Sequence, residues 1–315
     1  RQAGEAVLFC HVAPDGDTLG SARALELLLN ALGWRTAMVV DGEVPARLRF
    51  LPGLVLHRPE EWGMPENAAA IAVDVSSPDR LGKAEALYNA ADRRWVIDHH
   101  GTNPHFGQIN WVEGDAPATG ILVNRLYRAL EVPLSREAAI CLYTALSTDT
   151  GNFVYDSVNG ECFEMMAGLM EAGLPLAEIS RVLFREKRED FVRLLAVTLP
   201  SLRVTEAGCI AGLCTSLEQF RQNGLDPAET DGVVDYAIDI QGVCMAYYLH
   251  QQGENAVKAS LRALSPYRVD QTARRFGGGG HPQAAGCTLP MPLAQAVKEV
   301  EAALHQALEE QKTHE

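Results

Sequence analysis

The first half of the chain alternates short apolar segments with helical patterns, and this alternation limits the fold more than any other feature. The apolar segments have the length of strands and cover residues 7–10, 36–40, 69–73 and 94–97. The helical patterns cover residues 19–32 and 83–91. Strands that alternate with helices in this way form parallel sheets with right-handed crossovers. The sequence therefore predicts an α/β fold in which helices cover both faces of a parallel sheet.

Side chains that can bind metals follow three of these strands, at the point where each strand ends. They are His11, Asp15 and Asp17 after the first strand, Asp74 after the third, and Asp98, His99 and His100 after the fourth. In open α/β sheets, ligands bind at the carboxyl ends of the strands. Hard divalent cations prefer oxygen ligands, and Mn²⁺ also accepts an imidazole. The sequence thus predicts a metal site at this edge of the sheet.

Each of these groups also has an ordinary explanation when it is taken alone. Pro, Asp and Gly are common turn residues, an Asp after a strand is commonly a helix N-cap, and a His pair can be a surface feature. Chance would distribute such residues over both ends and the middle of the strands. Three groups at one end therefore favour the metal site.

A further acidic residue, Asp149, follows a helical pattern that begins near Ser135 and lies beside Gly151. The ordinary explanation is a turn at the end of the helix. However, an Asp at a helix C-terminus opposes the helix dipole. We therefore expect a cation to hold Asp149 in place.

Composition and charge exclude several classes of protein. The 315 residues are 47% hydrophobic and 22% charged, which is typical of one or two globular domains. A net charge of -14 argues against binding long duplex nucleic acid, which requires a basic surface. No apolar run has the length of a membrane span, and no signal-peptide pattern opens the chain. We expect a cytoplasmic protein that does not bind membranes.

The cysteines and the first residue add two smaller expectations. The 7 cysteines are odd in number and none belongs to a C-x-x-C pair. This pattern fits a reducing compartment rather than a disulfide framework or a zinc site. The chain begins at Arg1 instead of Met, directly before a strand. We therefore expect the natural protein to have further residues before it.

Four consecutive glycines precede His281 in the second half of the chain. A backbone without Cβ atoms can approach an anion closely, and His281 and Arg262 can donate hydrogen bonds to phosphate. The alternative is a flexible linker, but the glycines lie inside an otherwise ordered domain. We expect a phosphate-binding segment that comprises Arg262, Gly278, Gly279, Gly280 and His281.

These motifs resemble those of the DHH superfamily of phosphoesterases, in order and at fitting spacings. The resemblance rests on His11-x-x-x-Asp15-x-Asp17, on Asp74, on Asp98-His99-His100, on Thr148-Asp149-Thr150-Gly151 and on the glycine-rich loop of a DHH-associated C-terminal domain. It implies a DHH catalytic metal-binding domain over residues 1–185, a helical linker over 186–200 and a smaller α/β substrate-binding domain over 201–315. Within the superfamily, the chain is most similar to bacterial nano-RNases that also act as nucleotide phosphatases.

For the site, the resemblance implies hydrolysis with two Mn²⁺ ions, with Mg²⁺ or Co²⁺ as alternatives. One ion would be bound by His11, Asp15 and Asp74, and the other by Asp17, Asp74, His99 and Asp149. The catalytic residues would be Asp74, Asp98 and His100: Asp74 bridges the ions, His100 contacts the scissile phosphate, and Asp98 orients a neighbouring histidine. Arg262, His281 and the glycine loop would hold the substrate.

The activity that the resemblance implies is that of an exoribonuclease and phosphomonoesterase. It would hydrolyse oligoribonucleotides of two to five nucleotides to mononucleotides and convert 3′-phosphoadenosine 5′-phosphate to AMP. These substrates would bind in a cleft between the domains. The resemblance also leaves open that the protein forms a homodimer. One departure is Val154, which stands where many relatives carry Arg, and it bears on substrate contacts.

Three alternatives stay open. The first is a phosphodiesterase for cyclic or linear dinucleotides such as c-di-AMP, pApA or pGpG. The second is a manganese-dependent inorganic pyrophosphatase, which would carry a different C-terminal domain with a basic Arg/Lys signature. The third is a nucleotide sensor without catalysis, which would be expected to have lost metal ligands, whereas every ligand position is filled here.

Overall fold

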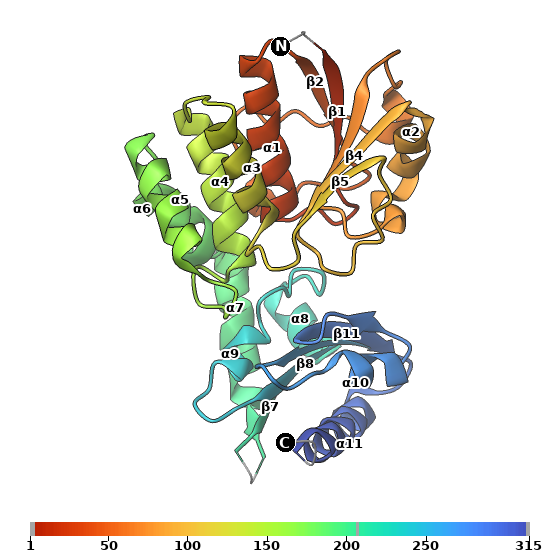
Figure 1. Cartoon of the computed structure of the whole chain (residues 1–315). Coiled ribbons are helices and arrows are strands. Elements are labelled where there is room, and N and C mark those ends of the chain that lie inside the picture. Colours follow the sequence, from red (N-terminus) through yellow and green to blue (C-terminus); the bar gives the residue numbers. More distant parts are fainter. Residues whose placement is uncertain (1–3, 206–207, 313–315) are drawn as a thin grey trace. The chain divides into compact units, whose positions relative to one another are not determined.

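The computed structural model describes residues 4–205 and 208–312, and the chain divides into two compact units, Arg1–Glu186 and Lys187–Glu315 (Figure 1). The first unit contains a five-stranded parallel sheet in the order β2-β1-β3-β4-β5. Its strands are β1 (Glu5–Phe9), β2 (Arg35–Val39), β3 (Ala69–Val73), β4 (Arg93–Asp98) and β5 (Ile109–Val112). The predicted α/β class and the parallel sheet are confirmed.

Helices cover both faces of this sheet (Figure 1). One face packs against α1 (Gly16–Ala31) and α3 (Thr119–Ala129), with α4 (Arg136–Asp149), α5 (Gly160–Glu171), α6 (Leu176–Ser180) and a π-helical turn (Arg181–Arg185) beyond them. The other face packs against a 3-10 helix (Pro78–Ala84) and α2 (Glu85–Ala90). Short 3-10 helices at Ala46–Leu48 and Pro59–Glu61 lie in a stretch for which the sequence indicates no regular element.

Two glycines allow α1 and α4 to approach closely. A Cβ atom at Gly20 would lie 2.4 Å from the carbonyl oxygen of Cys141, and one at Gly16 would lie 2.3 Å from Oγ1 of Thr148. Any larger side chain at these positions would push the helices apart. This close packing brings the start of α1, with its metal-binding residues, beside the end of α4.

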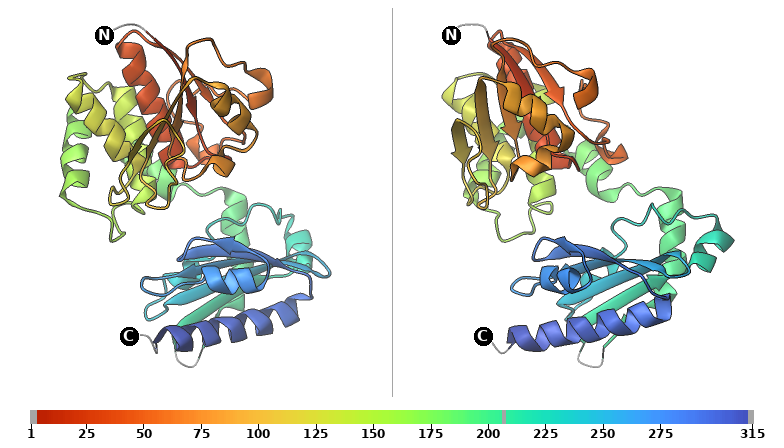
Figure 2. Two further views of the ribbon diagram at one scale, coloured as in Figure 1. Left: turned by 45° about the vertical axis from the view of Figure 1, so that its right-hand side comes forward. Right: turned by 90° about the vertical axis from the view of Figure 1, so that its right-hand side faces the viewer.

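The second unit contains a six-stranded mixed sheet in the order β10-β11-β9-β8-β7-β6. Its strands are β6 (Arg203–Val204), β7 (Ile210–Thr215), β8 (Met245–Gly253), β9 (Ala256–Ala263), β10 (Gly279–Gly280) and β11 (Ala284–Leu289). One face packs against α7 (Glu189–Thr198), a 3-10 turn (Leu199–Ser201), α8 (Leu217–Asn223) and α9 (Asp235–Ile238). The other packs against α10 (Asp270–Arg275) and α11 (Leu293–Lys312), which crosses the sheet in Figure 2.

One segment of the second unit differs from what the sequence predicts. The pattern over residues 226–239 predicts one helix, but only α9 forms, because Gly232 adopts a φ of +85°, which interrupts a helix. The segment expected as a helical linker, residues 186–200, contains the helix α7, and Leu194 and Leu195 of this helix belong to the core of the second unit. The turn that the sequence predicts at residues 206–208 lies mostly outside the described residues.

Candidate metal centre

The predicted metal ligands converge at the carboxyl ends of β1, β3 and β4 and at the end of α4. Together with His100, which was expected to contact the substrate, they form three groups, and within each group the ligand atoms lie within 4.8 Å of one another. The groups are His11, Asp15 and Asp74; Asp17, His99 and Asp149; and Asp74, His99 and His100. The sequence placed these residues at one edge of the sheet, and the structure shows which of them share a cluster.

Asp74 lies between the two predicted ligand sets. Its Oδ2 lies 3.8 Å from Nε2 of His11, whereas its Oδ1 lies 3.6 Å from Nε2 of His99. Its backbone has a φ of +59°, a left-handed conformation that Asp tolerates better than most residues. The hydroxyl of Thr119 donates to Oδ1 at 2.9 Å and holds the carboxylate in this orientation. The two carboxylate oxygens of Asp74 therefore face two different histidines of the cluster.

Asp15 combines a structural role with a place in the cluster. Its Oδ1 accepts hydrogen bonds from the backbone nitrogens of Asp17 and Thr18, both at 3.1 Å, and so caps α1. Its Oδ2 lies 3.5 Å from Nε2 of His11. Asp15 can therefore cap α1 and contribute to the cluster at the same time, because each role uses a different carboxylate oxygen.

His99 has the geometry of a metal ligand. Its Nδ1 lies 3.0 Å from the carbonyl oxygen of Ala116, so Nδ1 donates its proton there and Nε2 can offer its lone pair. Nε2 faces carboxylate oxygens of Asp149 at 3.1 Å and Asp17 at 3.7 Å, besides Asp74. Burial alone would lower the pKa of His99, but the hydrogen bond to Asp149 and the charges of Asp17 and Asp74 raise it to about 11.

The buried carboxylates show that this cluster lacks positive charge. Burial and the charge of Asp149 raise the pKa of Asp17 to about 7, although Ser21 and the backbone nitrogens of Thr119 and Gly120 donate to it. Burial and the neighbouring carboxylates raise the pKa of Asp74 well above its usual value. Ionised groups in such a place require a counter-ion. Oxygen and imidazole donors without a thiolate fit divalent cations such as Mn²⁺.

Asp98 belongs to none of the three groups and instead positions His100. It is fully buried, and it accepts hydrogen bonds from Nδ1 of His100 at 2.7 Å, from the backbone nitrogen of His99 at 2.9 Å and from Nδ2 of Asn103 at 2.6 Å. Burial would raise the pKa of Asp98, but the bond to His100 lowers it. With Nδ1 donating to Asp98, Nε2 of the half-buried His100 is free for another partner.

Sequence reasoning missed several residues that shape this site. Thr119 and Gly120, at the start of α3, donate to Asp17 and Asp74 from more than 40 residues away in the chain. Asn103 holds Asp98, and Arg80 contacts His11. Only the Thr-Gly pair after Pro117 carries a sequence signal, because it marks a helix N-terminus, where carboxylates are favourable.

The predicted phosphate-binding segment forms a hairpin in the second unit. Arg262 in β9 pairs with Ala284 in β11, and the backbone nitrogen of the exposed His281 donates to the oxygen of Ala284 at 2.8 Å. A Cβ atom at Gly278 would lie 2.1 Å from the oxygen of Gly286, and one at Gly280 would lie 2.5 Å from that of Ala284. Close strand pairing therefore explains these two glycines.

Gly279 differs from its neighbours, because a Cβ atom there would meet nothing within 4 Å. Its φ also lies outside the positive range that favours glycine. Packing within the described residues therefore does not require glycine at this position. Arg262 lies beside the hairpin, with Nε 3.5 Å from Oδ1 of Asp235.

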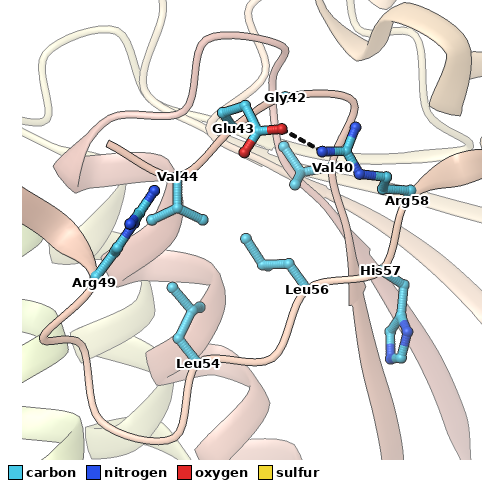
Figure 3. Close-up of a pocket in the computed structure, with 9 residues that line it drawn as sticks. All are labelled: Val40, Gly42, Glu43, Val44, Arg49, Leu54, Leu56, His57 and Arg58. Atoms are coloured by element: carbon cyan, nitrogen blue, oxygen red, sulfur yellow. Dashed lines mark hydrogen bonds and ion pairs between the residues drawn. The ribbon is translucent and has the colours of Figure 1, made fainter. Parts of the chain in front are cut away.

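A separate pocket of about 410 Å³ lies beyond the carboxyl end of β2 (Figure 3). Val44, Leu54 and Leu56 form its apolar wall, and Arg58 pairs with Glu43 at its rim. None of the residues that line it is a predicted metal ligand. This pocket is therefore separate from the cluster of candidate metal ligands.

The sheet and the clusters define an α/β protein whose acidic and histidine side chains are placed to bind a metal. The models of the DHH family, N-terminal domain, and of the DHHA1 domain match residues 5–146 and 209–310. The chain is 32% identical to the bifunctional oligoribonuclease and PAP phosphatase NrnA of Thermus thermophilus, over 97% of this chain and 90% of that protein. The chain belongs to the DHH family, as its motifs predict.

Two further comparisons agree with this family. A crystal structure of an exopolyphosphatase-related protein from Bacteroides fragilis matches with a TM-score of 0.89 and 26% identity, covering 97% of this chain and 93% of that one. The cyclic-di-AMP phosphodiesterase GdpP of Geobacillus thermodenitrificans is 23% identical over 98% of this chain and 48% of that protein. Among the described residues, no helix is both long and apolar enough to cross a membrane.

Proposed function

We propose that this chain is a metal-dependent phosphoesterase with two activities. It hydrolyses oligoribonucleotides of two to five nucleotides to mononucleotides, and it converts 3′-phosphoadenosine 5′-phosphate (PAP) to AMP. The observation that carries the proposal is a pair of carboxylate–histidine clusters that share Asp74, in a chain 32% identical to an oligoribonuclease and PAP phosphatase over 97% of its length. Both substrates would present a phosphate ester to the same clusters.

We infer that two Mn²⁺ ions bind here, with Mg²⁺ or Co²⁺ as alternatives. His11, Asp15 and Asp74 would hold one ion, and Asp17, Asp74, His99 and Asp149 the other. The inference is supported by the two oxygens of Asp74, which face different histidines, and by the lack of positive charge around the buried carboxylates. Bound divalent ions supply Lewis-acid polarisation of a phosphoryl oxygen and lower the pKa of an attacking water.

The remaining residues would bind and orient the substrate. His100 would contact the scissile phosphate through Nε2, because Asp98 holds its Nδ1–H. We assign catalysis to residues 1–185 and substrate binding to residues 201–315. In the second unit the segment that would hold a terminal phosphate or nucleotide comprises Arg262, Gly278, Gly279, Gly280 and His281. The open space at Gly279 supports this role, since an approaching anion could contact the bare backbone there.

A phosphodiesterase for cyclic or linear dinucleotides is the second candidate. It is favoured by the match to GdpP, which spans 98% of this chain although identity is lower. The metal clusters would serve both reactions equally. Only the choice of substrate separates the two candidates.

The deciding experiment is turnover with added Mn²⁺ of four substrates: a 5′-phosphorylated RNA dinucleotide, PAP, cyclic di-AMP and pyrophosphate. Asp74→Ala is the inactive reference, and Asp79→Asn is the matched control, because Asp79 is exposed and makes no side-chain contact in the described part of the chain. Turnover of the dinucleotide and PAP that Asp74→Ala abolishes supports the proposal. Turnover of cyclic di-AMP or pyrophosphate alone would contradict it.

A pair of glycine variants tests the substrate segment separately. Gly279→Ala should raise KM several-fold without changing the melting temperature, because its methyl group enters open space. Gly278→Ala should instead lower the melting temperature, because its methyl group would meet the backbone of β11. An unchanged KM in Gly279→Ala would remove this position from the substrate site.

A further inference from the structure

Arg80 lies against the turn that carries the first metal ligands. It belongs to the 3-10 helix Pro78–Ala84, and its carbonyl oxygen accepts a hydrogen bond from the backbone nitrogen of Val12 at 2.8 Å. Two residues later, a Cβ atom at Gly82 would lie 2.4 Å from Cγ1 of Val12. These contacts hold the backbone of Arg80 next to His11. The position of this arginine is therefore set by the same turn that positions the metal ligand.

The guanidinium of Arg80 is half-buried and nearly without partners. Its one side-chain contact among the described residues joins Nη2 to Nδ1 of His11 at 3.3 Å, and no carboxylate of those residues lies within 4.0 Å. Arg125 in the same unit shows the opposite arrangement, because Nε and Nη2 each contact Glu161 at 2.7 Å. An arginine offers five N–H donors. Most donors of Arg80 are therefore available to an anion.

The contact to His11 cannot persist once His11 binds a metal through Nε2. A guanidinium only donates hydrogen bonds, so Nδ1 of His11 must accept and Nε2 must carry the proton. However, Nε2 is the atom that faces Asp15 and Asp74 in the cluster. If Nε2 offers its lone pair to a metal, the proton of the neutral ring lies on Nδ1. Metal loading therefore leaves the Arg80 side chain without its one acceptor.

We propose that Arg80 binds a non-bridging oxygen of the scissile phosphate and is a catalytic residue on the His11 side of the centre. This inference rests on the proposed function and adds a residue to it. The ligand class is a phosphate mono- or diester, whatever nucleotide carries it. Carboxylates surround the centre, and the chain has a net charge of -14, so an anionic substrate needs a cation besides the ions. Arginine supplies bidentate, charge-assisted hydrogen bonds that match phosphate.

The test compares Arg80→Ala and Arg80→Lys with Arg47→Ala, an exposed arginine without a side-chain contact in the described residues. Calorimetric titration of inorganic phosphate into the Mn²⁺-loaded protein should show affinity at least about tenfold weaker for Arg80→Ala, intermediate for Arg80→Lys and unchanged for Arg47→Ala. For the dinucleotide, kcat/KM of Arg80→Ala should fall about 100-fold. Its affinity for Mn²⁺, titrated separately, should change little.

Two results would overturn the proposal. One is unchanged phosphate affinity in Arg80→Ala. The other is weaker Mn²⁺ binding with normal phosphate affinity at saturating metal, which would make Arg80 a positioning residue for His11. Phosphate binding needs no turnover, so the two proposals can fail separately. If the wild-type protein hydrolyses neither the dinucleotide nor PAP, while Arg80→Ala still weakens the affinity for inorganic phosphate, only the proposed function fails.

Discussion

Each unit of the molecule contains a histidine whose pKa is strongly shifted, and the surroundings of the two rings are opposite. Nε2 of His99 faces three carboxylates, which raise its pKa to about 11 against the effect of burial. His250 in β8 is fully buried between the rings of Tyr248 and Phe220, at 5.3 and 6.1 Å. Neither of its ring nitrogens has a hydrogen-bond partner among the described residues. Burial, together with the charge of Lys258, lowers the pKa of His250 to about 4.

The difference separates a site from a core. The surroundings of His99 favour positive charge so strongly that the cluster is electrostatically incomplete without a cation. The surroundings of His250 exclude charge and tolerate a polar ring because it stays neutral. A histidine with a shifted pKa therefore indicates a functional site when charged neighbours cause the shift, and a core position when burial causes it. Four experiments test this difference between the two units.

The largest effect is expected for Asp74→Asn, which keeps the hydrogen bond from Thr119 but removes the shared charge. Turnover with Mn²⁺ should fall at least about a thousandfold, or roughly 4 kcal/mol of transition-state stabilisation. The metal-free protein should become more stable, because burial and like charges disfavour the ionised carboxylate. Chemical unfolding in EDTA measures the second effect. A less stable variant would mean that the cluster does not lack positive charge.

The next largest effect is expected on the stability of the folded protein at acid pH, and His250→Phe should remove it. Because the folded pKa of His250 lies below its unfolded value, the unfolded state binds more protons as the pH falls below about 6.5. The wild-type protein should therefore lose about 3 kcal/mol of stability between pH 6.5 and pH 4 that His250→Phe does not lose.

This loss of stability is measured by urea unfolding at pH 7 and pH 4.5, with hydrogen exchange in β8 as the probe of the second unit. His305→Gln is the control, because His305 is exposed on α11 of the same unit. Equal acid sensitivity of His250→Phe and the wild-type protein would show that His250 is not held neutral.

Adding Mn²⁺ should then stabilise the first unit and leave the second unchanged. At one hundred times the dissociation constant, mass action adds about 2.7 kcal/mol. All 4 tryptophans lie in the first unit, so their fluorescence during urea unfolding reports on it alone. Hydrogen exchange should slow in β1, β3 and α4 but not in β8. Equal protection of β8 would mean that the two units do not respond separately.

The sequence predicts that the candidate metal ligands share one edge of the sheet, because most of them follow a strand and the carboxyl ends of neighbouring parallel strands lie at the same edge. The sequence does not predict contacts between side chains that are distant in the chain and meet only through tertiary packing. Examples are the contacts of Thr119 with Asp74 and of Arg80 with His11. In the second unit, the glycines read as a loop, yet Gly279 and Gly280 form β10. Pairing with β11 is a tertiary effect, which local composition does not encode.

The smallest expected effect tests whether Asp98 acts only by orienting His100. Asn103 is buried and donates through Nδ2 to Asp98 at 2.6 Å and to the oxygen of Val75 at 2.9 Å. Asn103→Ala should lower kcat/KM about tenfold, as expected when an outer hydrogen bond of a site is lost. Asn89→Ala, on the exposed side of α2, is the control.

The affinity of Asn103→Ala for Mn²⁺ decides how the result is interpreted. Asp98 belongs to none of the ligand groups, so calorimetry should give a dissociation constant close to that of the wild-type protein. A clear loss of metal affinity would mean that Asp98 acts on His99, whose backbone nitrogen it also binds at 2.9 Å. The chain of contacts from Asn103 would then support the metal ligands themselves, and His100 would lose its separate role.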